Sequence, residues 1–229
     1  VDEVLKNEFG LADGLADTCK IPIKWDTGQN DPKTGKPATI SKLVHRVQIL
    51  DPATGTGTFL AEVVKLVAER RKSVAPGQWS KYVEQDLIPR IHGFELLMAS
   101  YAMCHMKLDM ILTGLGYKPS PQPPRLGVYL TNSLEEGERV EQTLFGLSRA
   151  IAEEAKAASD IKRQTPIMCV IGNPPYNSSS SNNGPYIDSL IAPYKAELGE
   201  QKVNLNDDYI KFLSLGEHYI EKNGQGILA

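Results

Sequence analysis

Cysteine, long apolar runs and an excess of either charge are all scarce in this chain of 229 residues. The three cysteines, Cys19, Cys104 and Cys169, are too few and too widely spaced for a disulfide framework or a metal site, and reduced thiols indicate a cytoplasmic protein. No run of about 18 apolar residues occurs, and no basic head with an apolar core opens the chain. We therefore expect no membrane span and no secretion signal. The net charge of −3 excludes an overall basic surface, so phosphate contacts would have to come from a local patch or from other chain.

Short apolar runs suited to buried strands alternate with longer segments of helical spacing. The expected strands are 47–50 (followed by Asp51), 91–95, 126–130, 166–172 and 227–229. The expected helices are 1–9, 58–72 (with Thr58 as its cap), 79–90, 96–112, 135–162 and 207–222. Such alternation predicts an α/β domain with a largely parallel central sheet, and 41% hydrophobic residues suffice for one substantial core.

We divide the chain into a leading segment, 1–46, and a core, 47–229. The leading segment is expected to be irregular or helical, with a surface loop at 26–37 between two short extended pieces. The chain lacks an initial methionine and stops as the fifth expected strand begins. We therefore expect a fold truncated at both ends and belonging to a longer protein.

A glycine-rich turn follows the first expected strand, in the string Asp51-Pro-Ala-Thr-Gly-Thr-Gly57. Gly55 and Gly57 allow the backbone to approach a ligand at the start of a helix, whose free N–H groups attract polar groups. The third glycine of a dinucleotide fingerprint is missing, so no pyrophosphate is demanded. Asp51 could meet a cationic group there. S-adenosylmethionine fits these features, although a tight strand-to-helix turn without a ligand has the same spacing.

Polar side chains follow two further expected strands. Glu95 ends the second strand, where a carboxylate can accept hydrogen bonds from both hydroxyls of a ribose. Asn132 follows the third strand and could meet the adenine of a cofactor, although asparagine before serine is also ordinary turn chemistry. Because parallel strands end at one edge of a sheet, we expect these residues near the glycine-rich turn.

The second informative string is Asn173-Pro-Pro-Tyr176, which follows the fourth expected strand. Pro174 and Pro175 stiffen the chain, so the Asn173 side-chain oxygen and the Pro174 carbonyl are held in place. These two acceptors can hold both N–H bonds of an aromatic amine out of the ring plane, which directs the lone pair of the nitrogen toward a methyl donor. Tyr176 can stack on an extruded base. The two strings together predict methyl transfer to an amino nitrogen, by positioning rather than by acid–base chemistry or a metal.

Both strings also resemble the motifs of a known protein family. The strings 51–60 and 171–176, with similar text at 91–102 and 204–213, resemble adenine-N6 DNA methyltransferases that place the cofactor motif first, and in particular the methyltransferase part of Type ISP (single-polypeptide) restriction–modification enzymes. The resemblance implies a Rossmann-like S-adenosylmethionine-dependent methyltransferase fold and covers most of the chain.

The resemblance also implies roles for single residues. Asp51, Thr54, Gly55 and Gly57 would hold the methionine part of S-adenosylmethionine; Glu95 would hold its ribose, and Asn132, where the family usually has aspartate, would lie near its adenine. Asn173, Pro174, Pro175 and Tyr176 would hold a target adenine flipped out of double-stranded DNA. Target-recognition, helicase and nuclease parts of such an enzyme are not in the chain and would be its partners.

Three other functions compete with this one. A protein-glutamine methyltransferase would use the same Asn-Pro-Pro-Tyr grip, and a cytosine-N4 methyltransferase more often has serine in the place of Asn173. A non-catalytic cofactor-binding module would have lost residues from the glycine-rich turn or from the Asn-Pro-Pro-Tyr string, and both strings are intact. Further expectations concern single segments: core packing for the methionine-rich helix 98–110, flexibility for the polar loop 178–184, and helix-terminal charges for Asp207 and Asp208.

Overall fold

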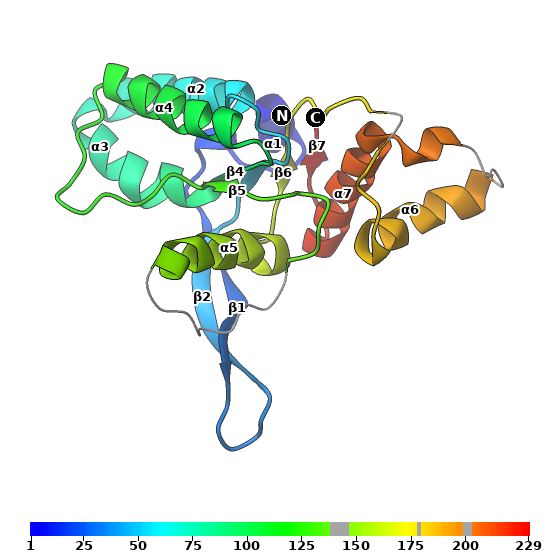
Figure 1. The fold of residues 1–229 in the computed structure, drawn as a ribbon. Helices are drawn as coiled ribbons and strands as arrows, with labels where there is room; N and C mark the ends of the chain where they lie inside the picture. Colours follow the sequence, from blue (N-terminus) through cyan, green and yellow to red (C-terminus); the bar gives the residue numbers. More distant parts are fainter. Residues whose placement is uncertain (138–146, 178–179, 199–202) are drawn as a thin grey trace.

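The computed structural model describes residues 1–137, 147–177, 180–198 and 203–229, and at its centre is a sheet of five parallel strands in the order β5-β4-β3-β6-β7. The strands are short: β3 (Ile49–Asp51), β4 (Ile91–Glu95), β5 (Val128–Leu130), β6 (Cys169–Val170) and β7 (Ile227–Leu228). All five lie within or overlap the expected segments, so the predicted α/β fold with a largely parallel sheet is confirmed (Figure 1).

Helices cover both faces of this sheet (Figure 1). One face carries α1 (Asp2–Asn7), α2 (Thr58–Val74), α3 (Trp79–Tyr82) and α4 (Met98–Gly114), and the other carries α5 (Leu147–Gln164), α6 (Pro185–Leu198) and α7 (Asp208–Asn223). Consecutive strand residues point to opposite faces, so Ile49 belongs to the first apolar cluster and Leu50 to the second. Cys169 and Val170 divide in the same way.

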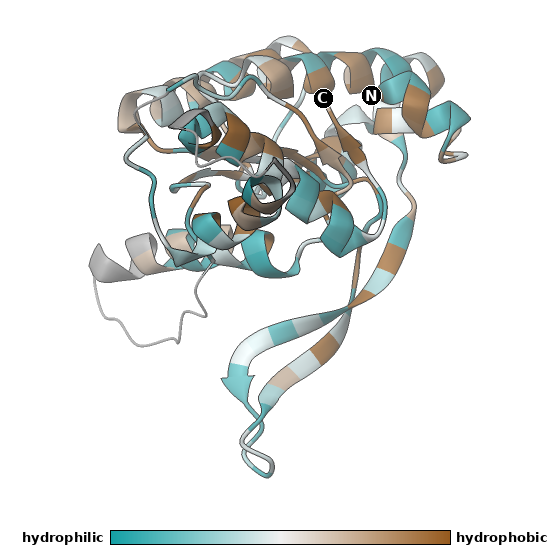
Figure 2. Cartoon of the chain, turned by 90° about the vertical axis from the view of Figure 1, so that its right-hand side faces the viewer, coloured by the Kyte–Doolittle hydropathy of each residue, from teal (hydrophilic) through white to brown (hydrophobic). Residues whose placement is uncertain are grey.

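The leading segment contains a long hairpin, where the sequence predicted only two short extended pieces around a loop. Strands β1 (Lys20–Asn30) and β2 (Pro37–His45) pair antiparallel, and the ribbon projects away from the body of the protein (Figure 2). The expected loop at 26–37 is therefore wrong in its extent, since only residues 31–36 connect the strands. Before the hairpin, α1 and a 3-10 turn at Gly14–Ala16 bury Leu5 in the same cluster as α2. The domain boundary at residue 46 stays a prediction.

Two expected helices differ from the structure in their form. The segment 79–90 begins as α3, continues as a π-helical turn (Val83–Leu87) and ends as a 3-10 turn (Ile88–Arg90), following another 3-10 turn at Pro76–Gln78. Pro89 cannot donate an intrahelical hydrogen bond, and burial of the Arg90 side chain fixes the last turn. The helix expected at 135–162 appears as α5, with residues 138–146 of that expectation outside the described residues.

The expectation of core packing for the methionine-rich helix 98–110, which is α4, is wrong for its methionines. Only Cys104, Leu108 and Leu112 are buried on it, whereas four of its methionines are more than half exposed: Met98, Met103, Met106 and Met110. The sequence alone could not separate these faces because the apolar residues of this helix do not favour one side at helical spacing. Helix α6 was not predicted at all, since Pro185 and Pro193 resemble loop residues; Pro185 instead occupies the first turn, where a missing N–H has no cost. A last 3-10 turn, Val203–Asn206, precedes α7.

Candidate active site

The turn between β3 and α2 is built on two glycines with left-handed backbone. Gly55 has φ 55° and Gly57 has φ 77°, which L side chains rarely adopt. A Cβ atom at Gly57 would lie 2.5 Å from Sγ of Cys104 on α4, whereas a Cβ at Gly55 would meet no atom within 4 Å. Gly57 thus allows α4 to pack closely against the turn, and Gly55 borders open space in which a ligand has room.

Thr54 holds the turn in shape. Its Oγ1 donates to the Asp51 carbonyl at 2.9 Å, and its backbone N–H donates to the carbonyl of Phe94 on β4 at 3.0 Å. The expected capping role of Thr58 is wrong, because Gly57 is the N-cap and no side chain caps α2. The first backbone N–H groups of α2 therefore have no side-chain acceptor. They are available to hydrogen-bond a polar ligand.

Glu95 is brought to this turn from the neighbouring strand. Its Oε2 accepts a hydrogen bond from the Gly55 backbone N–H at 2.8 Å, and its Oε1 accepts one from the Leu97 N–H at 2.7 Å. The structure thus joins two predicted site residues that are 40 positions apart. Each carboxylate oxygen keeps a second lone pair, so the group is fixed in orientation and can still accept from a ligand hydroxyl.

Asp51 is fully buried beneath the same turn. Its Oδ1 accepts a hydrogen bond from the Ala53 N–H at 3.1 Å, while its Oδ2 has no hydrogen-bond partner within the described structure. Burial, with a smaller contribution from the negative charge of Glu95, raises the pKa of Asp51 to about 7. A buried carboxylate oxygen of this kind calls for a positively charged partner. The residues at the turn therefore fit the amino group of S-adenosylmethionine.

Replacing Asp51 with asparagine is expected to stabilise the protein at pH 8 without cofactor. The ordinary pKa is 3.8 and the folded-state pKa is about 7, so the folded state binds the proton more strongly and stability falls as pH rises between these values. Asparagine is neutral and avoids this cost, so the free energy of unfolding should rise by roughly 1–3 kcal/mol at pH 8. Urea unfolding at pH 5 and pH 8 measures it, and the gain should shrink at pH 5.

Asp2→Asn is the matched control for Asp51→Asn. Asp2 is also buried, but it accepts hydrogen bonds from the Leu15 N–H and from Arg70, and its pKa is lowered. Its carboxylate is thus stabilised by partners, and Asp2→Asn should destabilise the protein at pH 8. A loss of stability in Asp51→Asn at pH 8, like that in Asp2→Asn, would show that Asp51 has a partner after all.

The Asn173-Pro-Pro-Tyr176 loop begins beside Asp51. Strand β6, which leads into it, pairs in parallel with β3, and a Cβ atom at Gly172 would lie 2.8 Å from Oδ1 of Asp51. Glycine at this position therefore allows the loop to run close against the first motif. Two strings that are 116 residues apart in the sequence (Gly57 to Asn173) thus meet at one edge of the sheet.

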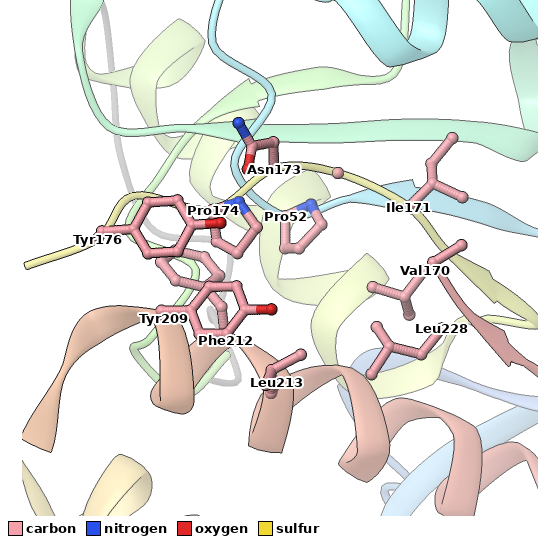
Figure 3. A pocket seen from close by; sticks show the side chains of 12 residues that line it. Pro52, Val170, Ile171, Asn173, Pro174, Tyr176, Tyr209, Phe212, Leu213 and Leu228 are labelled. Carbon is pink, nitrogen blue, oxygen red and sulfur yellow. The ribbon is translucent and has the colours of Figure 1, made fainter. Parts of the chain in front are cut away.

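A cavity of about 340 Å³ lies on one side of this loop (Figure 3). Its walls come from the loop and from Pro52, α7 and β7, with Phe212 and Leu228 among the apolar residues. In Figure 3 the Asn173 side chain points away from Tyr209 and Phe212. Asn173 and Pro175 are exposed, Pro174 is half-buried, and 72% of Tyr176 is exposed. The predicted acceptor residues are thus open to a large ligand.

Asn132 lies at the end of β5, but its polar atoms are engaged in the protein. Its Oδ1 accepts from the Leu134 N–H at 3.1 Å, and its Nδ2 donates to Glu135 and to Oδ1 of Asn182, both at 3.1 Å. Lys162 of α5 donates to the Asn132 carbonyl at 2.7 Å and holds the same turn. These contacts show turn chemistry at Asn132, and its role toward a cofactor stays a prediction.

Sequence reasoning missed the residues that hold the loop after Tyr176. Asp208 and Lys211 of α7 are buried and form hydrogen bonds with Asn177, Ser180, Asn182 and Asn183. The expected flexibility of the loop stays a prediction, and residues 178–179 lie outside the described residues. Asp207 caps α7 through the Tyr209 N–H, as a helix-terminal acid is expected to do. The available signal was Lys211 beside Phe212 and Leu215, a lysine within an apolar stripe.

A second missed feature follows Glu95. Leu96 and Leu97 are 60% and 63% exposed where β4 ends, beside the carboxylate that contacts Gly55. Exposed leucines at a polar site offer an apolar surface to a flat ligand. The sequence suggested only that a helix begins here, because leucine is common in helices.

Comparison with known proteins identifies the family. A family model described as N-6 DNA Methylase matches residues 37–226, which is most of the chain. The chain belongs to the N-6 DNA methylase family. No curated protein sequence gives a significant match to it.

Solved structures show the same fold. The chain is similar to a nuclease-deletion mutant of the Type ISP restriction–modification enzyme LlaGI in complex with a DNA substrate mimic, with a TM-score of 0.68, 22% identity and coverage of 100% of this chain and 16% of that one. The ATP-dependent Type ISP enzyme LlaBIII bound to DNA is similar with a TM-score of 0.68 and 22% identity, over 100% of this chain and 14% of that one. The DrdV–DNA complex is similar with a TM-score of 0.61 and 23% identity, over 99% of this chain and 18% of that one. The chain thus spans less than a fifth of each of these proteins.

These likenesses confirm the predicted methyltransferase fold of the chain. Its family implies S-adenosylmethionine as the methyl donor in general. Within the ranges that the structure describes, no three or more His, Cys, Asp or Glu side chains group as metal ligands do. In the same ranges, no helix has both the length and the apolar character needed to cross a membrane.

Proposed function

We propose that this chain is the catalytic domain of a site-specific DNA methyltransferase that acts on the N6 atom of a flipped adenine, within a restriction–modification enzyme. The observation that carries the proposal is the meeting of the two motifs, with Gly172 against Asp51. A methyl donor bound over the first motif and an amine bound on the second would then lie close enough for direct transfer of the methyl group.

Residues of the first motif have distinct tasks in binding S-adenosylmethionine. Asp51 neutralises the amino group of its methionine part, for which the unpartnered Oδ2 is suited. Thr54, Gly55 and Gly57 shape the turn that receives this part, with the uncapped α2 terminus facing its carboxylate. Glu95 accepts from the ribose hydroxyls. Leu96 offers an apolar contact to the adenine of the cofactor, while Asn132 keeps the adjoining turn in shape.

Residues of the second motif prepare the nucleophile. The adenine amine is a poor nucleophile because its lone pair is delocalised into the ring. The Asn173 side-chain oxygen and the Pro174 carbonyl accept hydrogen bonds from its two N–H groups, and Pro175 keeps the carbonyl rigid. When bound, S-adenosylmethionine supplies an electrophilic methyl group on a sulfonium. The amine held in this way would accept that methyl group and release one proton to solvent. Tyr176 stacks on the base and keeps its plane fixed.

The substrate and partners follow from the same proposal. LlaGI, LlaBIII and DrdV are described in complexes with DNA or a DNA mimic, and the first two are Type ISP restriction–modification enzymes. Since the chain has a net charge of −3, most phosphate contacts would come from other domains of one longer polypeptide. Such contacts would also offset the cost of base flipping, a few kcal/mol.

The test is to incubate the full-length protein with S-adenosylmethionine carrying a labelled methyl group and with genomic DNA. We expect label in N6-methyladenine after digestion of the DNA to nucleosides, at a defined sequence. Label in N4-methylcytosine would give the wrong base, and label in a protein glutamine would give the wrong substrate. Cofactor binding without any transfer would support the non-catalytic alternative.

A further inference from the structure

The ring of Tyr176 is covered on one face by a residue that neither motif contains. Tyr209, in the first turn of α7, stacks on it with ring centroids 4.9 Å apart and an angle of 16° between the ring planes (Figure 3). Both tyrosines line the cavity beside the catalytic loop. The stack therefore joins the loop to an element that lies 33 positions further along the chain.

One carboxylate holds both sides of this stack. Oδ1 of Asp207 accepts from the Tyr209 N–H at 2.9 Å and from the Asn177 N–H at 3.2 Å, and Asn177 directly follows Tyr176. The Asp208 N–H in turn donates to the Asn177 carbonyl at 3.1 Å. The backbone next to each ring is thus tied to the same helix terminus, so the rings face each other because of the fold and not by a chance rotamer.

A buried polar cluster fixes the helix terminus against the loop. The Asp208 carboxylate, 4% exposed, accepts from the side chains of Asn177, Ser180 and Asn182. Lys211, 1% exposed, donates to the Ser180 hydroxyl at 2.7 Å and to the Asn182 carbonyl at 2.5 Å. Breaking such a satisfied buried cluster is costly, so Tyr209 is held in place.

The spacing of the rings decides where a base can bind. A flat base inserted between them would need ring planes about 7 Å apart, twice the contact distance of about 3.5 Å between stacked atoms. The two centroids are only 4.9 Å apart, so the face of Tyr176 toward Tyr209 is closed. Tyr176 is nonetheless 72% exposed, which leaves its other face for the base.

We propose that Tyr209 is a positioning residue that backs Tyr176 and presents one face of its ring to the target base. This inference rests on the proposed function. Tyr209 does not touch the base; it acts by fixing the plane of the Tyr176 ring before DNA binds. Fixing a side chain in advance removes the ordering cost that binding would otherwise carry, and an aromatic pair holds it more firmly than an aliphatic contact does.

The test compares Tyr209→Leu, Tyr209→Phe and Tyr176→Ala with the double variant Tyr209→Leu/Tyr176→Ala in the full-length protein. Tyr209→Leu should lower kcat/KM for DNA about three- to tenfold and leave the Kd for S-adenosylmethionine unchanged, since an aromatic pair contributes about that factor. Tyr209→Phe should restore the rate to within about twofold. In the Tyr176→Ala background, Tyr209→Leu should have no further effect, because the ring it positions is gone.

Three results would overturn the inference: equal fold losses for Tyr209→Leu in both backgrounds, a Tyr209→Phe variant as slow as Tyr209→Leu, or an unchanged rate for Tyr209→Leu. Thermal unfolding of each variant detects a general loss of structure, and Tyr209→Phe keeps the test open if Tyr209→Leu does not fold. Tyr194→Leu on α6, outside the stack and the cavity lining, is the matched control and should keep the parent rate. A parent protein that transfers no methyl group to DNA contradicts the proposed function itself.

Discussion

Replacing Asn173 with alanine is expected to lower methyl transfer to DNA roughly 100- to 1000-fold, the usual effect of losing one pre-organised hydrogen-bonding group in an active site. The variant removes the acceptor that would hold one amine hydrogen and leaves the Pro174 carbonyl in place. Because the Asn173 side chain is exposed and points away from Tyr209 and Phe212, the fold should tolerate the change (Figure 3). Single-turnover transfer of labelled methyl groups measures the rate, and calorimetry with S-adenosylmethionine should give a nearly unchanged Kd.

Two substitutions at the same position separate hydrogen bonding from shape. Asn173→Asp keeps an acceptor oxygen and should retain much more activity than Asn173→Ala, whereas Asn173→Leu keeps the size of the side chain and should be as slow as alanine. If Asn173→Leu were nearly as active as the parent, the side-chain oxygen would not hold the amine. The role of the Asn-Pro-Pro-Tyr loop would then rest on the Pro174 carbonyl alone.

The positions of the five sheet strands could be predicted because each is a short apolar run. Asp51 and Glu95 end β3 and β4, Gly172 follows β6, and parallel strands bring such ends to one edge. The contact between Glu95 and the Gly55 N–H was not predicted, since residue spacing gives no hydrogen-bond partners. The positions of these residues at strand ends did predict that they lie near each other.

Other parts were missed because their order depends on contacts distant in sequence. The hairpin of β1 and β2 pairs segments in which polar residues and prolines interrupt the apolar ones, so local patterns did not show how far the pairing extends. The loop after Tyr176 has a composition typical of flexible chain, and its composition does not show the hydrogen bonds that Asp208 and Lys211 of α7 make to Ser180. The exposed methionines of α4 carry no sequence signal of the face they occupy.

Gly57→Ala is expected to act mainly on stability, and Gly55→Ala mainly on the affinity for S-adenosylmethionine. At Gly57 the new Cβ would lie 2.5 Å from Sγ of Cys104 and the φ of 77° would strain any L residue, so the free energy of unfolding should fall by roughly 2–5 kcal/mol. At Gly55 only the backbone strain applies, a loss of roughly 1–2 kcal/mol. The Gly55 Cβ would instead enter the open space that the proposed function assigns to the cofactor, so the Kd for S-adenosylmethionine should rise at least roughly tenfold.

Urea unfolding without cofactor and calorimetry with S-adenosylmethionine measure both quantities on the same preparations. Cys104→Ala provides a specific rescue, because it removes the sulfur that the Gly57→Ala methyl would strike but keeps Cβ of residue 104, which lies 3.5 Å from the new methyl position. The double variant should recover the part of the stability loss that comes from overlap and keep the part that comes from φ. An affinity for S-adenosylmethionine that is unchanged in Gly55→Ala would remove the open side of this turn from the cofactor site, since a ligand that lies over Gly55 cannot avoid the added methyl group.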